Sequence, residues 1–350
     1  MSLLAPPEEL FSWLEQNGVT YVVLRDGHRV NSERLEDIDL LVDDAAIDDL
    51  KTAFGKRRRG LKVDCYGVKG LYGSDYHGFP HLPEPLGEQI LRHRQKVDGV
   101  WLPQPIDELN ALLYHVIYHK NLQSGFHAFA PDLSKPGAYS ARIVELQANC
   151  GVALSPTHEC FHTHLSALGF AVDEKRLIAY LEHDFRYGRR SLFHARLQNE
   201  HPGELNLFVI RAIALRHHKS EALLDFLAEK YRIVTTKPID WWTRVTRARH
   251  MRGGKWRHGG RPHIAVVVFD SSPSPSTPEE HEVHPLVFNR NQFIKLQWRD
   301  WFCRNTSARI KDSPIHSTDN EAEALSHLPL FFSPEERSST HDSLPGLRAE

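Results

Sequence analysis

The sequence predicts a two-domain α+β protein, and three observations support this prediction. The chain has 350 residues, of which 41% are hydrophobic and 25% charged, so it can bury a full core and is long enough for two domains. Short apolar stretches that suit strands alternate with longer stretches whose apolar residues recur at helical spacing. Polar segments near residue 200 separate two such series. We therefore expect one domain over residues 1–200 and a second over residues 201–340, followed by a tail over residues 341–350.

Composition and charge narrow the class of protein. A formal net charge of -2 gives no reason to expect nucleic acid or an anionic membrane as a partner. The start of the chain has no basic region, and no apolar run approaches the length that spans a bilayer. Four cysteines are scattered without CxxC spacing, which favours a reducing cytoplasm over a disulfide framework: Cys65, Cys150, Cys160 and Cys303.

The first domain should begin with a helix that Pro6 and Pro7 open, because Leu10, Phe11 and Leu14 form one apolar face and Asn17-Gly18 ends it. Apolar runs then predict strands over residues 21–24, 37–42 and 61–66, with a short helix over residues 45–54. Helical spacing continues over residues 106–121, 141–148, 156–168 and 173–185.

Three carboxylates fall within these strands. Alternation places Asp37 and Asp39 on one face of their strand, and Asp64 can point the same way from a neighbouring strand. Clustered carboxylates repel one another unless a cation lies among them, and Mg²⁺ suits such oxygen ligands. The sequence therefore predicts a Mg²⁺ site at these three aspartates.

The order helix, strand, Asp-x-Asp strand, helix, Asp strand resembles the nucleotidyltransferase superfamily over roughly residues 7–125. The most specific part is Leu24-Arg25-Asp26 followed by Asp37-Ile-Asp39. The resemblance implies that Asp37, Asp39 and Asp64 hold metal ions for nucleotidyl transfer. Arg25-Asp26 stand where the superfamily usually has Gly-Ser or Gly-Gly, so either Arg25 binds the nucleotide's phosphates by its charge or the site is inactive.

Two histidines, His115 and His119, lie one turn apart on the helix predicted over residues 106–121. Such a pair could bind a metal ion. Since no HExxH pattern provides a general base beside it, we favour helix packing or a phosphate contact.

The second domain should alternate strands and helices. Strands are expected over residues 205–210, 232–235 and 264–269, with helices over residues 220–231, 240–249 and 289–302, and a last short strand leads into a turn that contains His316. This series predicts a ferredoxin-like sandwich. The polar sequence after Arg337 predicts disorder.

The stretch from Ser313 to Glu336 carries the chemistry expected of this domain. It sets His316 in a polar turn before a helix that Thr318, Asp319 or Asn320 could cap. A neutral imidazole can attack phosphorus, and a helix N-terminus accepts anionic oxygens. His316 is therefore a candidate nucleophile.

This stretch resembles the histidine loop of nucleoside diphosphate kinases, in which a His-Gly-Ser-Asp turn precedes a helix and an aromatic pair followed by Pro-Glu-Glu. The resemblance extends over roughly residues 204–340. It implies that His316 accepts a phosphoryl group and that Thr318 is the loop hydroxyl. It also implies a nucleotide-binding arginine, which is either Arg299 or Arg304, and a phosphate-binding Arg211 in place of the family's lysine.

Three further positions depart from that family. Ser313 replaces an asparagine, Ser317 a glycine, and His327 the glutamate that orients the nucleophilic imidazole. The last change matters most, because an imidazole without that partner has no fixed tautomer.

We therefore expect a nucleotide-binding transferase that takes a nucleoside triphosphate and passes a nucleotidyl or phosphoryl group to an acceptor such as a sugar phosphate or a nucleoside diphosphate. The kinase resemblance also implies a homo-oligomer. The alternative is a catalytically degenerate protein that senses nucleotides or mediates assembly. The departures at Arg25, Ser313 and His327 favour that alternative.

Overall fold

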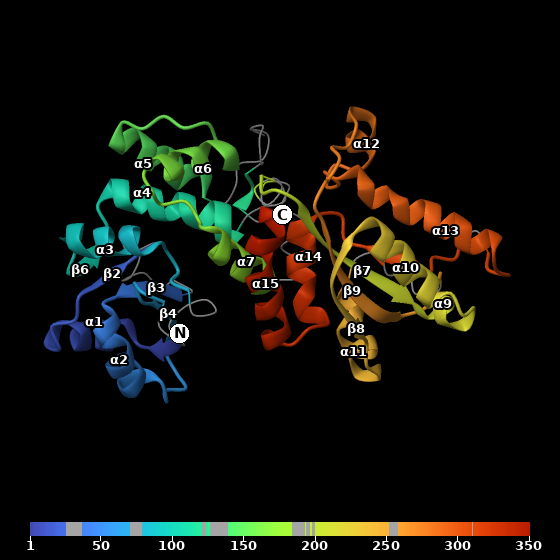
Figure 1. The fold of residues 1–350 in the computed structure, drawn as a ribbon. Coiled ribbons are helices and arrows are strands. Elements are labelled where there is room, and N and C mark those ends of the chain that lie inside the picture. The colour runs from blue at the N-terminus through green and yellow to red at the C-terminus, as the bar shows by residue number, and fades with distance from the viewer. Residues whose placement is uncertain are drawn as a thin grey trace. The chain divides into compact units, whose positions relative to one another are not determined.

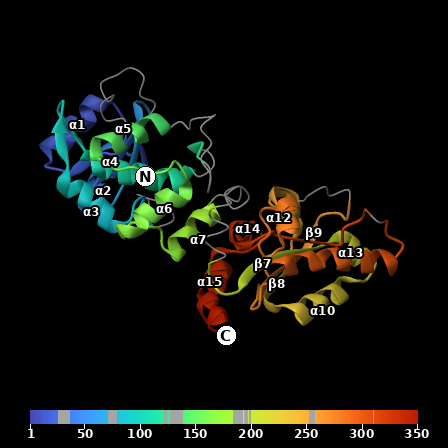
Figure 2. The ribbon, with the colours of Figure 1, turned by 90° about the horizontal axis from the view of Figure 1, so that it is seen from above.

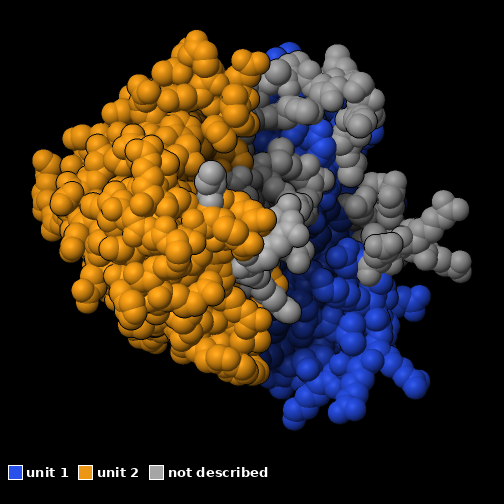
Figure 3. Space-filling model, turned by 90° about the vertical axis from the view of Figure 1, so that its right-hand side faces the viewer, with its two compact units in different colours: residues 1–180 blue, residues 181–350 orange. Residues whose placement is uncertain are grey.

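The computed structural model divides into two compact units, Met1–Tyr180 and Leu181–Glu350 (Figure 3). The structure describes residues 1–25, 37–70, 79–120, 124–126, 139–183, 193, 197, 200–251, 258–309 and 311–350. Asp26, which belongs to the Leu-Arg-Asp motif, lies outside the described residues. The fold mixes helices and sheets as expected, but the division between the units falls earlier in the chain than the boundary expected at residue 200. Within the described ranges, every helix is too short or too polar to cross a membrane.

A mixed four-stranded sheet forms the centre of the first unit. Its strands are β1 (Ser2–Ala5), β2 (Tyr21–Val23), β3 (Asp37–Val42) and β4 (Leu61–Tyr66), in the order β1-β4-β3-β2. Strands β3 and β4 run parallel, whereas β1 and β2 run antiparallel to their neighbours. The predicted bounds of β3 and β4 are confirmed.

Two helices cover one face of this sheet, α1 (Pro7–Gln16) and α2 (Ile47–Phe54), the latter preceded by a 3-10 turn at Asp44–Ala46. Alternate residues of β3 enter the core beneath them, because side chains of a strand point to opposite faces in turn. Ile38, Leu40 and Val42 take the core side, which leaves Asp37 and Asp39 on the other face.

Further helices follow in the first unit, arranged as in Figure 1. Helix α3 lies against β2 and β3, and α4 packs against α3, α5 and α6. Helix α4 continues directly into a π-helix. The elements are α3 (Glu84–His93), the hairpin β5 (Gln95–Val97) and β6 (Val100–Leu102), α4 (Pro105–Tyr114), the π-helix η3 (His115–Lys120), α5 (Ser140–Cys150), α6 (His158–Ala167) and α7 (Glu174–His183), the last of which crosses the division between the units.

The second unit contains an antiparallel sheet in the order β10-β7-β9-β8. Its strands are β7 (Glu204–Arg211), β8 (Arg232–Pro238), β9 (Pro262–Asp270) and β10 (Ile315–Ser317). Helices α10 (Ser220–Lys230) and α13 (Ile294–Arg304) cover one face, where their apolar side chains meet those of Phe208, Ile210 and Ile315.

The remaining helices of this unit extend its ends and cover its second face. Helix α14 lies beside β7 on the side away from α10 and α13, with α15 next to it (Figures 1 and 2). These elements are α9 (Ala212–Arg216), α11 (Trp241–Thr246), η5 (Ala248–His250), α12 (Pro278–Val283), η6 (Arg290–Phe293), α14 (Glu321–His327), η7 (Leu328–Leu330) and α15 (Pro334–Ala349).

The expectation of a disordered tail is wrong, because residues 334–349 form helix α15. A capping box joins Ser333 and Glu336 at its start, which satisfies backbone N–H groups that would otherwise lack partners. Leu344 and Leu347 are buried, and Arg348 pairs with the buried Glu321 of α14. Burial of these leucines thus outweighs the polar composition of the segment.

Candidate functional sites

Asp37, Asp39 and Asp64 lie on one face of the first unit's sheet. In the parallel pairing of β3 with β4, Asp39 stands directly opposite Asp64, and Asp37 stands opposite Lys62. Residues two apart on a strand share a face, so all three carboxylates belong to the face away from α1 and α2. We call Asp37, Asp39 and Asp64 the acidic group.

Two of these carboxylates are held by neighbouring side chains. Both oxygens of the buried Asp39 have partners, because Arg25 donates from Nε to Oδ2 at 2.9 Å and the hydroxyl of Tyr66 donates to Oδ1 at 3.0 Å. Asp64 accepts from Lys62 Nζ at 2.6 Å and also from the hydroxyl of Ser2.

Asp37 is the exposed member of the acidic group. Burial of part of its carboxyl raises its pKa, and the negative charges of Asp39 and Asp64 raise it further, while Lys62 and Arg25 oppose this effect. The mutual repulsion that the sequence predicts is therefore present, and the protein offsets it with two cations of its own.

The donor set of the acidic group suits Mg²⁺, since hard divalent cations prefer carboxylate oxygens. Within the described residues, however, the three carboxylates do not form one of the groups whose ligand atoms all lie within 4.8 Å of one another. Asp39 and Asp64 would have to exchange Arg25 and Lys62 for the ion. The three carboxylates thus have the right donor atoms for Mg²⁺ and lie on the same face of the sheet, but their side chains must rearrange to bind the ion.

Arg25 and Tyr66, the partners of Asp39, also contact a cluster of histidines that no local sequence pattern predicts. Arg25, which pairs with Asp39, also contacts Nε2 of His115, the first residue of the π-helix. Tyr66, which donates to Asp39, stacks on the ring of His81 with ring centroids 3.9 Å apart. The two segments that carry His81 and His115 therefore lie over the acidic face of the sheet.

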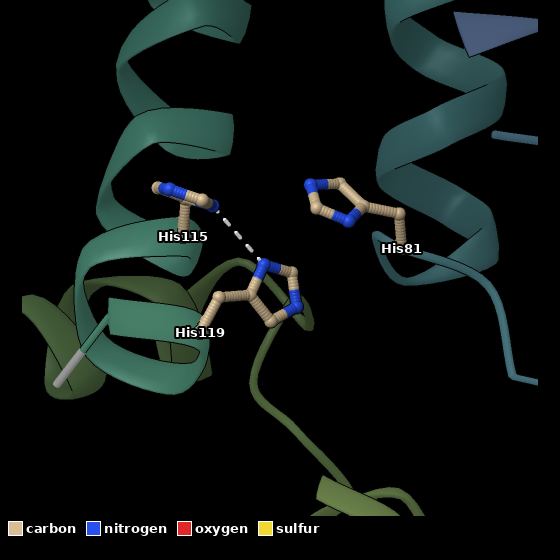
Figure 4. Close-up of side chains that lie close together, drawn as sticks. All are labelled: His81, His115 and His119. Carbon is tan, nitrogen blue, oxygen red and sulfur yellow. Dashed lines mark hydrogen bonds between the residues drawn. The ribbon is translucent and has the colours of Figure 1, made fainter. Parts of the chain in front are cut away.

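His81, His115 and His119 meet one another at this point (Figure 4). The Nδ1 atoms of His115 and His119 are 3.2 Å apart, and the ring centroids of His81 and His119 are 4.3 Å apart. Burial lowers the pKa of all three imidazoles well below its usual value, and the charge of Arg25 lowers the pKa of each further. All three side chains are therefore neutral at pH 7. Nothing in the sequence around His81 distinguishes it from the chain's other histidines.

In the second unit, the structure brings Arg211 and Arg299 to the same segment of chain. The backbone N–H of Arg211 donates to the carbonyl of Pro314, and Nε of Arg299 donates to the carbonyl of Ile315 at 3.1 Å. Burial lowers the pKa of Arg211 to about 10, and the nearby positive charge of Arg299 contributes to this shift. Two cations that disfavour each other in this way would both be stabilised by a bound anion.

His316 lies within strand β10 and not in a turn after it, which corrects the expectation from the sequence. It pairs with Val209 of β7, whereas the neighbouring Ile315 faces the core beneath α10 and α13. His316 is half-buried, and its partner Val209 stands two residues before Arg211 on β7. Asn320 is the residue that caps α14.

Two residues expected at this site are held elsewhere. Thr318 follows β10 directly and is 1% exposed, and its hydroxyl donates to Asn206 and accepts from the backbone N–H of Leu207, so it is held against β7. Arg304 is exposed on α13, where it pairs with Asp300 one turn earlier. Of the two arginines expected to precede the histidine, only Arg299 therefore lies beside β10.

His327, which stands where the kinases have an orienting glutamate, is completely buried at the end of α14. Trp241 and Trp242 lie on α11 and are exposed.

Comparison with known proteins gives no family model that matches this chain and no significant match among curated proteins.

Proposed function

We propose that the first unit is a nucleotidyltransferase-type domain that binds a nucleoside triphosphate at the acidic group. The observation that carries this proposal is the parallel register of β3 and β4, which sets Asp39 opposite Asp64 with Asp37 two residues earlier on the same face. Three carboxylates on one face of a mixed sheet are the arrangement that the resemblance implies. The acceptor would be a hydroxyl or phosphate group, as of a sugar phosphate or a protein.

In the proposed reaction, the acceptor oxygen attacks the α-phosphorus and pyrophosphate leaves. Mg²⁺ held by Asp37, Asp39 and Asp64 would neutralise charge on the triphosphate. Arg25 would exchange its contact with Asp39 for a phosphate oxygen, since a guanidinium binds either anion. Tyr66 would keep Asp39 oriented through the hydrogen bond from its hydroxyl.

Titration of the chain with a nucleoside triphosphate, with and without Mg²⁺, tests this proposal. Asp37→Asn should abolish the Mg²⁺-dependent part of binding, because this change removes a charge from the acidic group without breaking a side-chain contact of Asp39 or Asp64. Asp49→Asn is the matched control, since Asp49 is an exposed acid on α2 in the opposite layer. Equal Mg²⁺-dependent binding by the wild type and Asp37→Asn would refute the assignment.

A second candidate activity lies in the second unit, for which we infer a ferredoxin-like sandwich of the nucleoside diphosphate kinase type. The strand order β10-β7-β9-β8 with α10 and α13 on one face supports this fold. Arg211 and Arg299 beside the segment that enters β10 would hold phosphate oxygens while His316 accepts the γ-phosphoryl group and a nucleoside diphosphate leaves.

Incubation with γ-labelled ATP tests the second activity. Acid-labile label should appear on His316 and should be absent from a His316→Ala protein, whereas His284→Ala, which removes an exposed histidine beyond α12, should keep it. Label retained in His316→Ala would show that another residue is modified.

A non-catalytic nucleotide sensor is the competing function, and the Arg25–Asp39 ion pair favours it. An arginine that neutralises one carboxylate of the acidic group reduces the charge available to a metal ion. Nucleotide binding that persists without any transfer of α-label or γ-label to product or protein would support this reading over both activities.

A further inference from the structure

The three histidines described above form a compact set of nitrogen donors beside the acidic group. His115 and His119 come from the π-helix, which directly extends α4, and His81 comes from the turn before α3 (Figure 4). One ring nitrogen from each lies within 4.8 Å of the others, and no other described set of three His, Cys, Asp or Glu side chains meets this condition. Short π-helical turns inside helices frequently occur at functional sites.

The distance between two of these donors suits a shared metal ion. Two imidazole nitrogens bound to one tetrahedral Zn²⁺ at its usual bond length are about 3.3 Å apart. The Nδ1 atoms of His115 and His119 are 3.2 Å apart, which matches this separation.

The surroundings fix these rings in position. Tyr66 stacks on His81 with an interplanar angle of 20°, while Tyr114 and Tyr180 present their edges to His119 with centroid distances of 5.4 and 5.1 Å. A site whose ligands are already held loses less conformational entropy when the ion binds.

Arg25 determines which ring nitrogen of His115 carries the proton before an ion binds. A guanidinium only donates hydrogen bonds, so the contact with Arg25 makes Nε2 of His115 an acceptor and puts the proton of His115 on Nδ1. That proton is then donated to Nδ1 of His119. An ion bound by both Nδ1 atoms requires the proton of His115 to move to Nε2 and Arg25 to withdraw from that nitrogen.

We propose that His81, His115 and His119 bind one divalent transition-metal ion of the zinc class, at a site separate from the acidic group. Three protein ligands leave a fourth coordination position for water or a substrate oxygen, as in catalytic zinc sites. Imidazole donors favour Zn²⁺, Co²⁺ or Ni²⁺, whereas the carboxylates of the acidic group favour Mg²⁺. The chain would thus hold two kinds of ion on the same side of one sheet.

Metal titration of the full chain, freed of metal with a chelator, tests this inference. Zn²⁺ in competition with a chromogenic chelator should give one ion per chain, and Co²⁺ should give the strong visible absorption of a four-coordinate site. His115→Gln and His119→Gln should each weaken binding at least about 100-fold, since even the loss of an outer-shell partner of a ligand typically costs 10- to 100-fold.

Two controls make the result specific. His93→Gln removes an exposed imidazole of the same unit and should leave affinity unchanged. Asp37→Asn should also leave Zn²⁺ affinity unchanged, so that a failure of the Mg²⁺ proposal can be told from a failure of this one. Unchanged affinity in His115→Gln and His119→Gln would overturn the inference.

If the histidine variants do not fold, the Co²⁺ absorption spectrum of the wild-type chain tests the proposed site. A folded wild-type chain, verified by circular dichroism, that binds no Zn²⁺, or that gives only the weak absorption of six-coordinate Co²⁺, would overturn the proposed three-histidine site. Strong four-coordinate absorption at one ion per chain, unaffected by Asp37→Asn, would support it.

Discussion

Replacement of the buried Glu204 by glutamine should stabilise the second unit in a pH-dependent way. Glu204 is the first residue of β7 and is 3% exposed. Burial raises the pKa of this carboxyl from 4.5 to about 8, and the charges of Glu321 and Asp270 act in the same direction, while Asn289 and Asn206 lower it.

The sign and size of the effect follow from linkage. Because the folded pKa is raised, the folded state binds more protons than the unfolded state above pH 4.5, so wild-type stability falls as pH rises toward 8. Each pH unit in this window costs about 1.4 kcal/mol, which amounts to about 3 kcal/mol at pH 7 and about 5 kcal/mol above pH 8. Glu204→Gln lacks this cost, because its amide does not ionise.

Urea denaturation followed by tryptophan fluorescence at several pH values measures the effect. The stability difference between Glu204→Gln and the wild type should increase between pH 5 and pH 8. Any change in hydrogen bonding made by the amide adds a constant to this difference. Glu229→Gln, at an exposed position of α10, should show no such slope. A Glu204→Gln difference that stays constant with pH would refute the raised pKa.

Three further predictions concern the second unit. Leu344→Ala should destabilise it by about 3 kcal/mol in urea denaturation, since this buried leucine anchors α15, whereas an unstructured terminus would make the change neutral. Arg299→Gln should weaken the binding of ATP, measured by calorimetry, about tenfold, which is a typical loss for one charged hydrogen bond. Arg304→Gln should leave the affinity unchanged, because Arg304 is exposed and paired on α13. Equal losses of affinity in the two variants would refute a phosphate-binding role of Arg299. Gly259→Ala should lower the thermal midpoint, because its φ is +130° and a Cβ there would lie 2.1 Å from a backbone carbonyl oxygen, while Gly346→Ala, which meets nothing within 4 Å inside α15, should not.

Local sequence pattern predicted the parts of the fold whose signal lies within a few residues. The bounds of β3 and β4 were predictable because apolar residues alternate there with charged ones, and alternation alone assigns side chains to faces. Strand β1 could not be found in this way, because four residues at the chain start become a strand only through pairing with β4. Helix α15 was misjudged for a related reason, since its few leucines stabilise it only once tertiary packing buries them.

The candidate sites show the same contrast between local sequence pattern and tertiary packing. The sequence by itself determined which residues carry useful chemistry, because side-chain types and their spacing on one strand or one helix are fixed locally, as for Asp37 with Asp39 and His115 with His119. Only the tertiary structure decided which distant groups join them. Parallel pairing set Asp64 opposite Asp39, and chain packing brought His81 to the two histidines of the π-helix. Such contacts depend on how segments far apart in the chain pack together, and no short-range pattern records that.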